Sequence, residues 1–168
     1  MLFDGIGDFF LHMLEFVSEL ESWQQIGALV LVSAIPFIES YLGSFIGILV
    51  QMEPVLAVAV ASVGNAIATF LLIAGASRAR TAVLNGRKSA DAVAPTKRRQ
   101  KVAKYMDRFG VPGVSLLGPL ALPSQFTGPT MVALGASARS VYFWMGISII
   151  AWGVLFGFFT EFAIRYFG

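Results

Sequence analysis

Four long apolar stretches follow an amphipathic segment along this chain of 168 residues. Two of them, 54–76 and 140–160, contain no charged side chain. At about 1.5 Å per residue, each is long enough to cross a hydrocarbon core of roughly 30 Å. The pattern therefore predicts two membrane-spanning helices, 54–76 and 140–162, the second flanked by aromatic residues that suit the membrane interface.

The other two apolar stretches, 24–52 and 109–138, are broken near their centres. Proline lacks a backbone donor and disfavours helix in the residue before it. Each half has about ten residues, which is too short to span a bilayer. This favours re-entrant hairpins, whose freed backbone groups must be buried in protein or face a water-filled cavity. The alternative is two kinked full spans in a four-helix bundle. The predicted breaks are at Pro36, Pro119, Pro123 and Pro129.

The order of these segments indicates a duplication. A broken segment and an intact span form a first membrane repeat, 23–76, and the same pair recurs in 109–168. If each broken segment enters and leaves on one side, the two repeats have opposite topology. We therefore expect an all-α integral membrane protein built from two inverted repeats. Such paired, interrupted segments are typical of a transporter site near the bilayer midplane.

Charge gives the orientation of the chain. Ten of the 12 Lys and Arg residues lie between Arg78 and Arg108, whereas 1–53 holds seven carboxylates and no Lys or Arg. Because basic residues beside spans stay on the cytoplasmic side, the segment 77–108 is predicted to be a cytoplasmic loop. A content of 57% hydrophobic and 13% charged residues is too apolar for a small soluble protein. The basic residues are explained by topology, so nucleic acid is not an expected partner.

Two amphipathic helices are predicted outside the spans. Residues 1–22 place apolar side chains at helical spacing opposite acidic ones, which is typical of a helix lying on the membrane surface. Residues 96–109 form a basic counterpart with Thr96 as N-cap. This second helix has two readings: contact with anionic lipid headgroups or an acidic partner, or topology retention alone. The candidate headgroup contacts are Arg98, Arg99, Lys101 and, at the cytoplasmic end of the last span, Arg139.

Three polar residues fall where the bilayer should be deepest. Glu39 follows Pro36 at the first break, and an ionisable group at depth is a functional hypothesis by default. It is a candidate for proton coupling or substrate contact, unless a shallow hairpin leaves it in headgroup water. Gln125 occupies the matching break, and Asn65 the middle of the first span. For these two, hydrogen bonding between helices is the alternative to a substrate contact.

Other chemistry has no visible site in the sequence. There is no cysteine, and the single histidine has no second ligand at metal spacing. No nucleophile with a base, phosphate-binding loop or carboxylate pair is present. We therefore expect no enzyme activity, metal or cofactor.

Two stretches of the chain resemble the small multidrug export family and, more distantly, the DedA or VTT-domain superfamily. The stretches are Ala34–Gly43, around Pro36 and Glu39, and Lys104–Gly135, where Asp107-Arg108-Phe109-Gly110 precedes the proline-rich break. The resemblance covers about residues 30 to 162. DedA proteins carry an arginine near the place of Gln125, so their transport of anionic lipids does not carry over to this chain.

The resemblance implies a multi-pass exporter of amphipathic compounds in a bacterial-type plasma membrane. With Glu39 in the break, a lipophilic cation or neutral amphiphile exchanged for a proton suits the residues best, although a lipid-like molecule stays open. Because only two spans are secure, transport would need a homo-oligomer or deep re-entrant segments. The competing prediction is a non-catalytic accessory or assembly subunit of a larger membrane complex.

Overall fold

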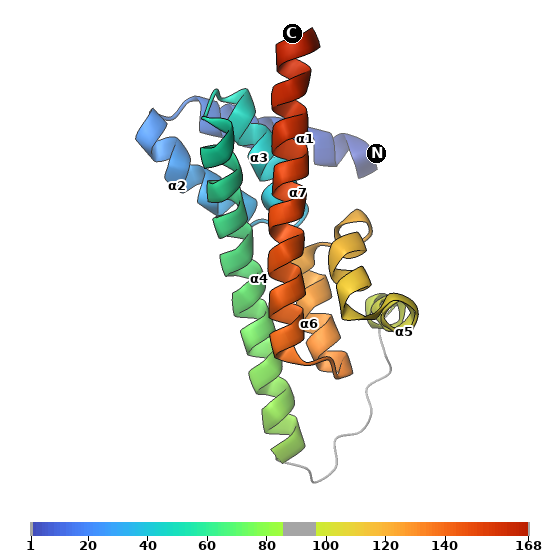
Figure 1. Cartoon of the computed structure of the whole chain (residues 1–168). Helices are drawn as coiled ribbons and strands as arrows, with labels where there is room; N and C mark the ends of the chain where they lie inside the picture. The colour runs from blue at the N-terminus through green and yellow to red at the C-terminus, as the bar shows by residue number, and fades with distance from the viewer. Residues whose placement is uncertain (1, 86–96, 168) are drawn as a thin grey trace. The chain divides into compact units, whose positions relative to one another are not determined.

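The computed structural model describes residues 2–85 and 97–167, without the side chains of 2–6, 84–85, 98 and 99. The regular elements of these residues are all helical, which confirms the predicted all-α class for the described part of the chain (Figure 1). They are α1 (Leu2–Ser18), α2 (Ser22–Ser33), α3 (Glu39–Leu49), α4 (Pro54–Asn85), α5 (Lys97–Leu117), the 3-10 turn η1 (Gly118–Leu120), α6 (Ser124–Leu134) and α7 (Ala138–Phe167).

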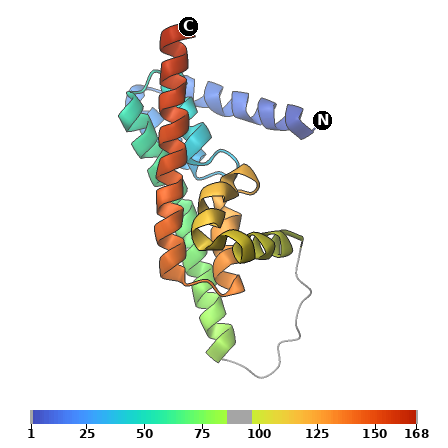
Figure 2. The same ribbon diagram turned by 45° about the vertical axis from the view of Figure 1, so that its right-hand side comes forward.

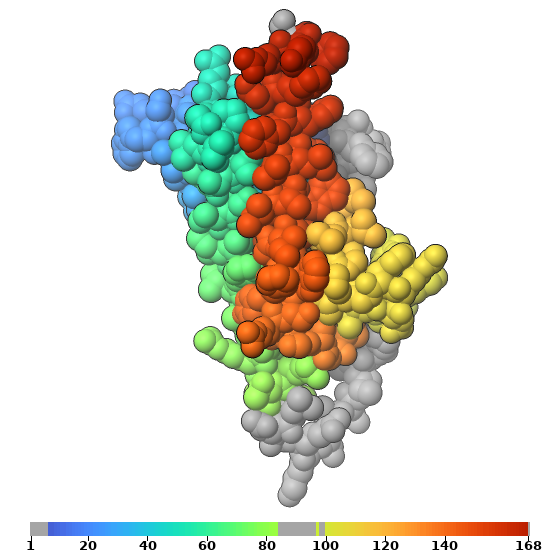
Figure 3. Space-filling view, viewed as in Figure 1, coloured from blue at the N-terminus to red at the C-terminus, as the bar shows by residue number. Residues whose placement is uncertain are grey.

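Two of these helices are long and apolar enough to cross a membrane. The qualifying segments are Pro54–Val83 of α4 and Ala138–Phe167 of α7, each 30 residues long. Both contain the spans predicted from the sequence, 54–76 and 140–162. Figure 3 shows one side of α7 at the surface along its length, and apolar side chains there include Phe143, Ile150 and Phe159. Length, composition and exposed apolar surface together indicate a membrane protein.

The chain divides into two units, and each long helix contributes one part to each of them. Unit 1 comprises Met1–Ile67 and Ile149–Gly168, and unit 2 comprises Ala68–Ser148. Each unit contains one helical hairpin, the first made of α2 and α3 and the second made of the end of α5, η1 and α6.

In unit 1, the first hairpin packs against α1 and the first part of α4. Its core consists of buried aliphatic side chains, Val17, Ala28, Leu29, Val32, Ile38, Ile46 and Val60. The α1 residues Phe10, Met13, Val17 and Leu20 join this core, so the apolar face of the amphipathic helix covers the hairpin. A capping box at Glu21 and Gln24 starts α2.

Small residues bring the helices of unit 1 close together. A Cβ on Gly64 of α4 would overlap the backbone carbonyl of Val30 in α2. A Cβ on Gly47 of α3 would lie 2.8 Å from that of Ala57 in α4. Helix association in membranes relies on such close approach, because lipid provides no hydrophobic drive between helices.

In unit 2, α5 is two helices joined at Gly110. The backbone there has φ 65° and ψ −175°, a conformation essentially restricted to glycine. The amphipathic part, 97–109, therefore ends where the second hairpin begins, and Figure 2 shows the sharp change of direction. The core of unit 2 joins α4, α5, α6 and α7 through Ile73, Val102, Val114, Met131, Val132, Ala136, Val141 and Met145.

Candidate functional site

The turn of the first hairpin, residues 34–38, has an unusual backbone. Phe37 has φ 75° and Glu39, the first residue of α3, has φ 53°. Residues other than glycine rarely adopt this left-handed region, and each instance costs about 1–3 kcal/mol. The backbone groups at the turn are satisfied locally, since Ile38 and Glu39 donate to the Ile35 carbonyl and the Tyr41 hydroxyl donates to the Phe37 carbonyl. A turn of this kind can therefore exist away from bulk water.

Glu39 is the only carboxylate buried among the described residues, with 1% of its surface exposed. The following positions on α3 are small and hydroxylated. Ser40 donates a hydrogen bond of 2.7 Å to the Ile149 carbonyl of α7, and Ser44 donates one of 2.7 Å to the Ser40 carbonyl. The hydroxyl of Ser40 thus ties the residue after Glu39 to α7 within unit 1.

A seam of small and polar residues surrounds this contact. A Cβ on Gly153 of α7 would lie 3.0 Å from the Ser62 hydroxyl and 3.4 Å from the Ser44 hydroxyl. The hydroxyls of Ser33 and Ser62 are buried and make no hydrogen bond with the described residues. Asn65 lies one turn beyond Ser62 on α4 and is 1% exposed. We call Glu39, Ser40, Ser44, Ser62 and Asn65 the first polar cluster.

The start of α6 in the second hairpin is also polar and buried. Ser124, Gln125 and Thr127 are 1%, 3% and 1% exposed, and Pro123 occupies the N-cap position. Ser124 and Thr69 of α4 share a hydrogen bond of 3.0 Å between their hydroxyls. The hydroxyl of Ser124 also lies 3.4 Å from the Gln125 side-chain oxygen, at the limit of a hydrogen bond.

A second hydroxyl contact joins the other leg of this hairpin to α7. Ser148 donates a hydrogen bond of 2.6 Å to the Ser115 carbonyl, and both side chains are 1% exposed or less. We call Thr69, Ser115, Ser124, Gln125 and Ser148 the second polar cluster. In each unit, serine or threonine hydroxyls thus hold the hairpin against a long helix.

The predicted proline breaks differ in their outcome. Pro36 lies in the turn between α2 and α3, Pro119 in η1, and Pro123 directly before α6. Pro129 lies inside α6 rather than at a break. It has no N–H to donate to the carbonyl of Gln125 four residues earlier, yet α6 continues to Leu134. The second break therefore ends at Pro123.

The structure places the sequence-predicted residues in both units. Glu39, Asn65 and Pro36 belong to unit 1, whereas Gln125 and the other prolines belong to unit 2. The predicted headgroup contacts Lys101 and Arg139 are exposed in unit 2, and the side chains of Arg98 and Arg99 lie outside the described residues. The N-cap predicted at Thr96 also lies outside them.

Sequence reasoning missed the hydroxyl residues that anchor both hairpins. A signal was present, because Ser40 and Ser44, Gly43 and Gly47, and Gly153 and Gly157 are each four residues apart on a helix. That spacing places small residues on one face, where another helix can approach closely.

The arrangement does not provide a metal centre within the described residues, which hold no group of three or more His, Asp or Glu side chains. No protein-family model matches the chain, and no curated protein or solved structure matches it either.

Proposed function

We propose that this protein is a membrane transporter that exports amphipathic compounds and couples their movement to a proton through Glu39. The observation that carries the proposal is the state of this one residue. Its carboxyl group is 1% exposed, at the turn of a hairpin, on a backbone in the left-handed region. Buried ionisable groups and strained backbone are costly and concentrate at functional sites.

The lengths of the hairpin helices support a re-entrant arrangement. The legs α2 and α3 have 12 and 11 residues. At about 1.5 Å per residue they reach roughly 17–18 Å, well short of a hydrocarbon core of about 30 Å. The α6 leg also has 11 residues. Hairpins that enter and leave on one side fit these lengths better than kinked full spans do.

An inverted repeat follows from the same proposal. A short hairpin precedes α4, and another precedes α7. With the basic segment 77–108 on the cytoplasmic side of a plasma membrane, the first hairpin enters from outside and the second from the cytoplasm. Each turn then carries a buried polar start of a helix, at Glu39 and at Gln125. Half-helix ends near the midplane are the usual place for a transporter's substrate and coupling ion.

The chemistry of Glu39 suggests an exchange cycle. As a carboxylate it stabilises a lipophilic cation in the site, and when it takes up a proton it releases that cation. One proton then replaces one monovalent cation, so the charge carried by the site stays balanced. Asn65 and Gln125 offer donors and acceptors to the polar part of an amphiphile without adding charge.

Transport in proteoliposomes tests this proposal. Purified protein is reconstituted, a pH gradient is imposed, and the flux of tetraphenylphosphonium and the coupled proton flux are measured. We expect Glu39→Gln to abolish proton-coupled flux, because the amide cannot exchange a proton. The matched control is Glu19→Gln, which removes the same charge from an exposed side chain. Full proton-dependent transport by Glu39→Gln would refute the role of Glu39.

An accessory subunit is the second candidate function, and the end of α7 favours it. Phe159, Phe162 and Phe167 are 68%, 51% and 85% exposed. Such a surface suits lipid or the apolar face of a partner protein. Native mass spectrometry of the protein extracted in mild detergent from its own host separates the two. A homo-oligomer supports the transporter, whereas stoichiometric foreign subunits support the accessory role.

A further inference from the structure

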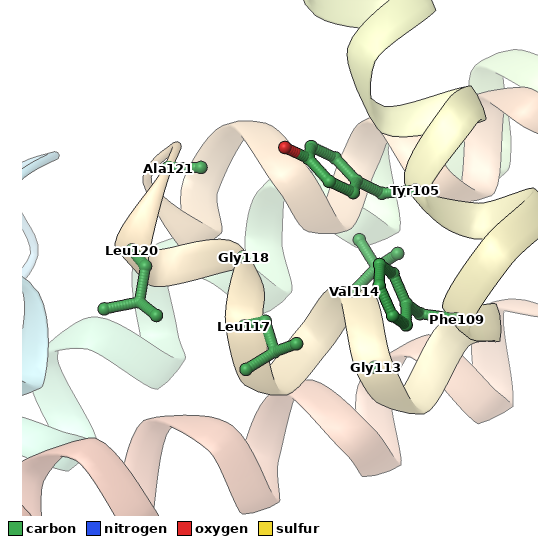
Figure 4. Close-up of a pocket in the computed structure, with 8 residues that line it drawn as sticks. All are labelled: Tyr105, Phe109, Gly113, Val114, Leu117, Gly118, Leu120 and Ala121. Atoms are coloured by element: carbon green, nitrogen blue, oxygen red, sulfur yellow. The ribbon is translucent and has the colours of Figure 1, made fainter.

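A groove on unit 2 lies between the two parts of α5. It has a volume of about 230 Å³ and is lined by Tyr105 and Phe109 of the amphipathic part and by residues from the far side of the Gly110 bend (Figure 4). The lining from beyond the bend is Gly113, Val114, Leu117, Gly118, Leu120 and Ala121. We call this the α5 groove. Apart from the Tyr105 hydroxyl, its side chains carry only carbon and hydrogen.

Two glycines give the groove its shape. Gly110 turns the chain back, and a Cβ on Gly113 would lie 2.5 Å from that of Phe109. The absence of that atom lets the second part of α5 run close beneath the aromatic ring. Tyr105 and Phe109 themselves stack, with ring centroids 6.3 Å apart and planes at 26°. Both rings are about two-fifths exposed, at 41% and 43%.

The rim of the α5 groove is positively charged. The guanidinium carbon of Arg108 lies 5.2 Å from the centroid of the Phe109 ring, so the charge lies beside an aromatic wall of the groove. Lys101 borders a smaller adjoining cavity of about 20 Å³, which shares Tyr105, Val114, Gly118 and Ala121 with the α5 groove. The side chain of Lys104, between them in sequence, is exposed. An occupant must therefore be apolar in the groove and anionic at its rim.

We propose that the α5 groove binds one acyl chain of an anionic membrane phospholipid, with the phosphate of that lipid held by Lys101 and Arg108. The volume of about 230 Å³ is below the roughly 300–1,000 Å³ of pockets for drug-sized ligands. It suits part of a single chain instead. A basic amphipathic helix lies at the level of the lipid headgroups, which brings this rim to the phosphate. The proposal concerns other residues than Glu39 and does not require that the protein transports anything.

Photo-crosslinking tests the site. The full chain is reconstituted in phosphatidylcholine vesicles that contain a small fraction of either phosphatidylglycerol or phosphatidylcholine with a diazirine on the acyl chain. Labelled peptides are then identified by mass spectrometry. We expect the phosphatidylglycerol probe to label the segment 105–121 and the phosphatidylcholine probe to label it several-fold less. Equal labelling by both probes, or labelling by neither, would overturn the proposal.

Two pairs of variants separate the groove from its charge. Ala121→Phe adds a ring to an exposed position in the groove, and we expect it to reduce labelling of 105–121 at least fivefold. Its control is Ala79→Phe, at an exposed position on α4. Lys101→Gln with Arg108→Gln should reduce labelling by phosphatidylglycerol about fivefold for each charge removed. Arg78→Gln, which removes an exposed charge on α4, is the control for this pair.

The charge variants keep the test decisive if Ala121→Phe does not fold, because they alter only exposed side chains. Size-exclusion profiles and thermal midpoints establish folding for each variant. Unchanged phosphatidylglycerol labelling in a folded Ala121→Phe protein, or in the double charge variant, would overturn the proposal.

Discussion

Gly64 of α4 is the position where a single added methyl group should disturb the first hairpin most. A Cβ there would overlap the carbonyl of Val30 and would lie 2.9 Å from the Cα of the same residue. Carbon atoms pack best at about 3.5–4.0 Å, so Gly64→Ala must push α2 away from α4 by roughly 0.6–1.1 Å. The obstacle is backbone, which cannot turn aside as a flexible side chain could.

The cost follows from the contacts that this movement opens. A gap of about 0.5–1 Å forfeits a quarter to a half of the dispersion energy of each contact across it. Overpacking of this kind usually costs about 1–3 kcal/mol. Alanine in a helix gains about 0.8–1.0 kcal/mol over glycine, which offsets part of the cost. We therefore expect Gly64→Ala to destabilise the protein by about 1–2 kcal/mol.

Gly75 provides a matched control on the same helix. A Cβ at Gly75 meets nothing within 4 Å, so Gly75→Ala should keep the helix gain and stabilise the protein by up to about 1 kcal/mol. Thermal unfolding in one detergent, followed by far-UV circular dichroism, should separate the two midpoints by roughly 5–10 °C. If Gly64→Ala is as stable as Gly75→Ala, α2 does not pack on α4 through Val30 and the first hairpin is misplaced.

Three further predictions address the turns and anchors. Gly110→Ala should lower the unfolding free energy by about 1–3 kcal/mol through its left-handed backbone, whereas Gly27→Ala, at an open helical position, should not; equal midpoints would contradict the bend. A double-mutant cycle of Ser124→Ala and Thr69→Val in thermal unfolding should give a coupling of about 0.6 kcal/mol, and zero coupling would deny the 3.0 Å contact. Phe37→Gly should change stability by less than about 1 kcal/mol, because relief at φ 75° offsets the lost half-exposed ring; a loss of about 3 kcal/mol in the same assay would show that the ring is a core group.

The sequence predicted the two long helices but ended both of them too soon. Arg78 and Arg80 ended the first predicted span, since charges mark the edge of the hydrocarbon. The helix itself continues to Asn85. Arginine is a good helix former, so a helix can extend beyond the membrane that the apolar run defines. Hydropathy gives the crossing segment, and helix propensity decides where the backbone stops.

The local conformation at the breaks was harder to predict. Proline marked the positions of Pro36 and Pro123, but nothing in residue type indicated the left-handed backbone at Phe37 and Glu39, which neither side chain favours. Pro129 misled in the opposite direction, because a helix held by tertiary packing tolerates a proline when neighbouring groups satisfy the freed carbonyl. Such conformations depend on contacts from other parts of the chain, which a single sequence does not display.

The way in which the first hairpin is held bears on how Glu39 could exchange a proton. The contact of α3 with α7 relies on the Ser40 hydroxyl, which donates to a helix carbonyl, and on the small residue Gly153. A hydrogen bond of this type in a membrane contributes on average about 0.6 kcal/mol, so breaking it needs little energy. The turn that carries Glu39 already holds about 1–3 kcal/mol of backbone strain at each left-handed residue. A hairpin with a weak anchor and a strained tip can open locally without loss of its aliphatic core, and a buried carboxyl group that must meet water in each cycle requires such an opening.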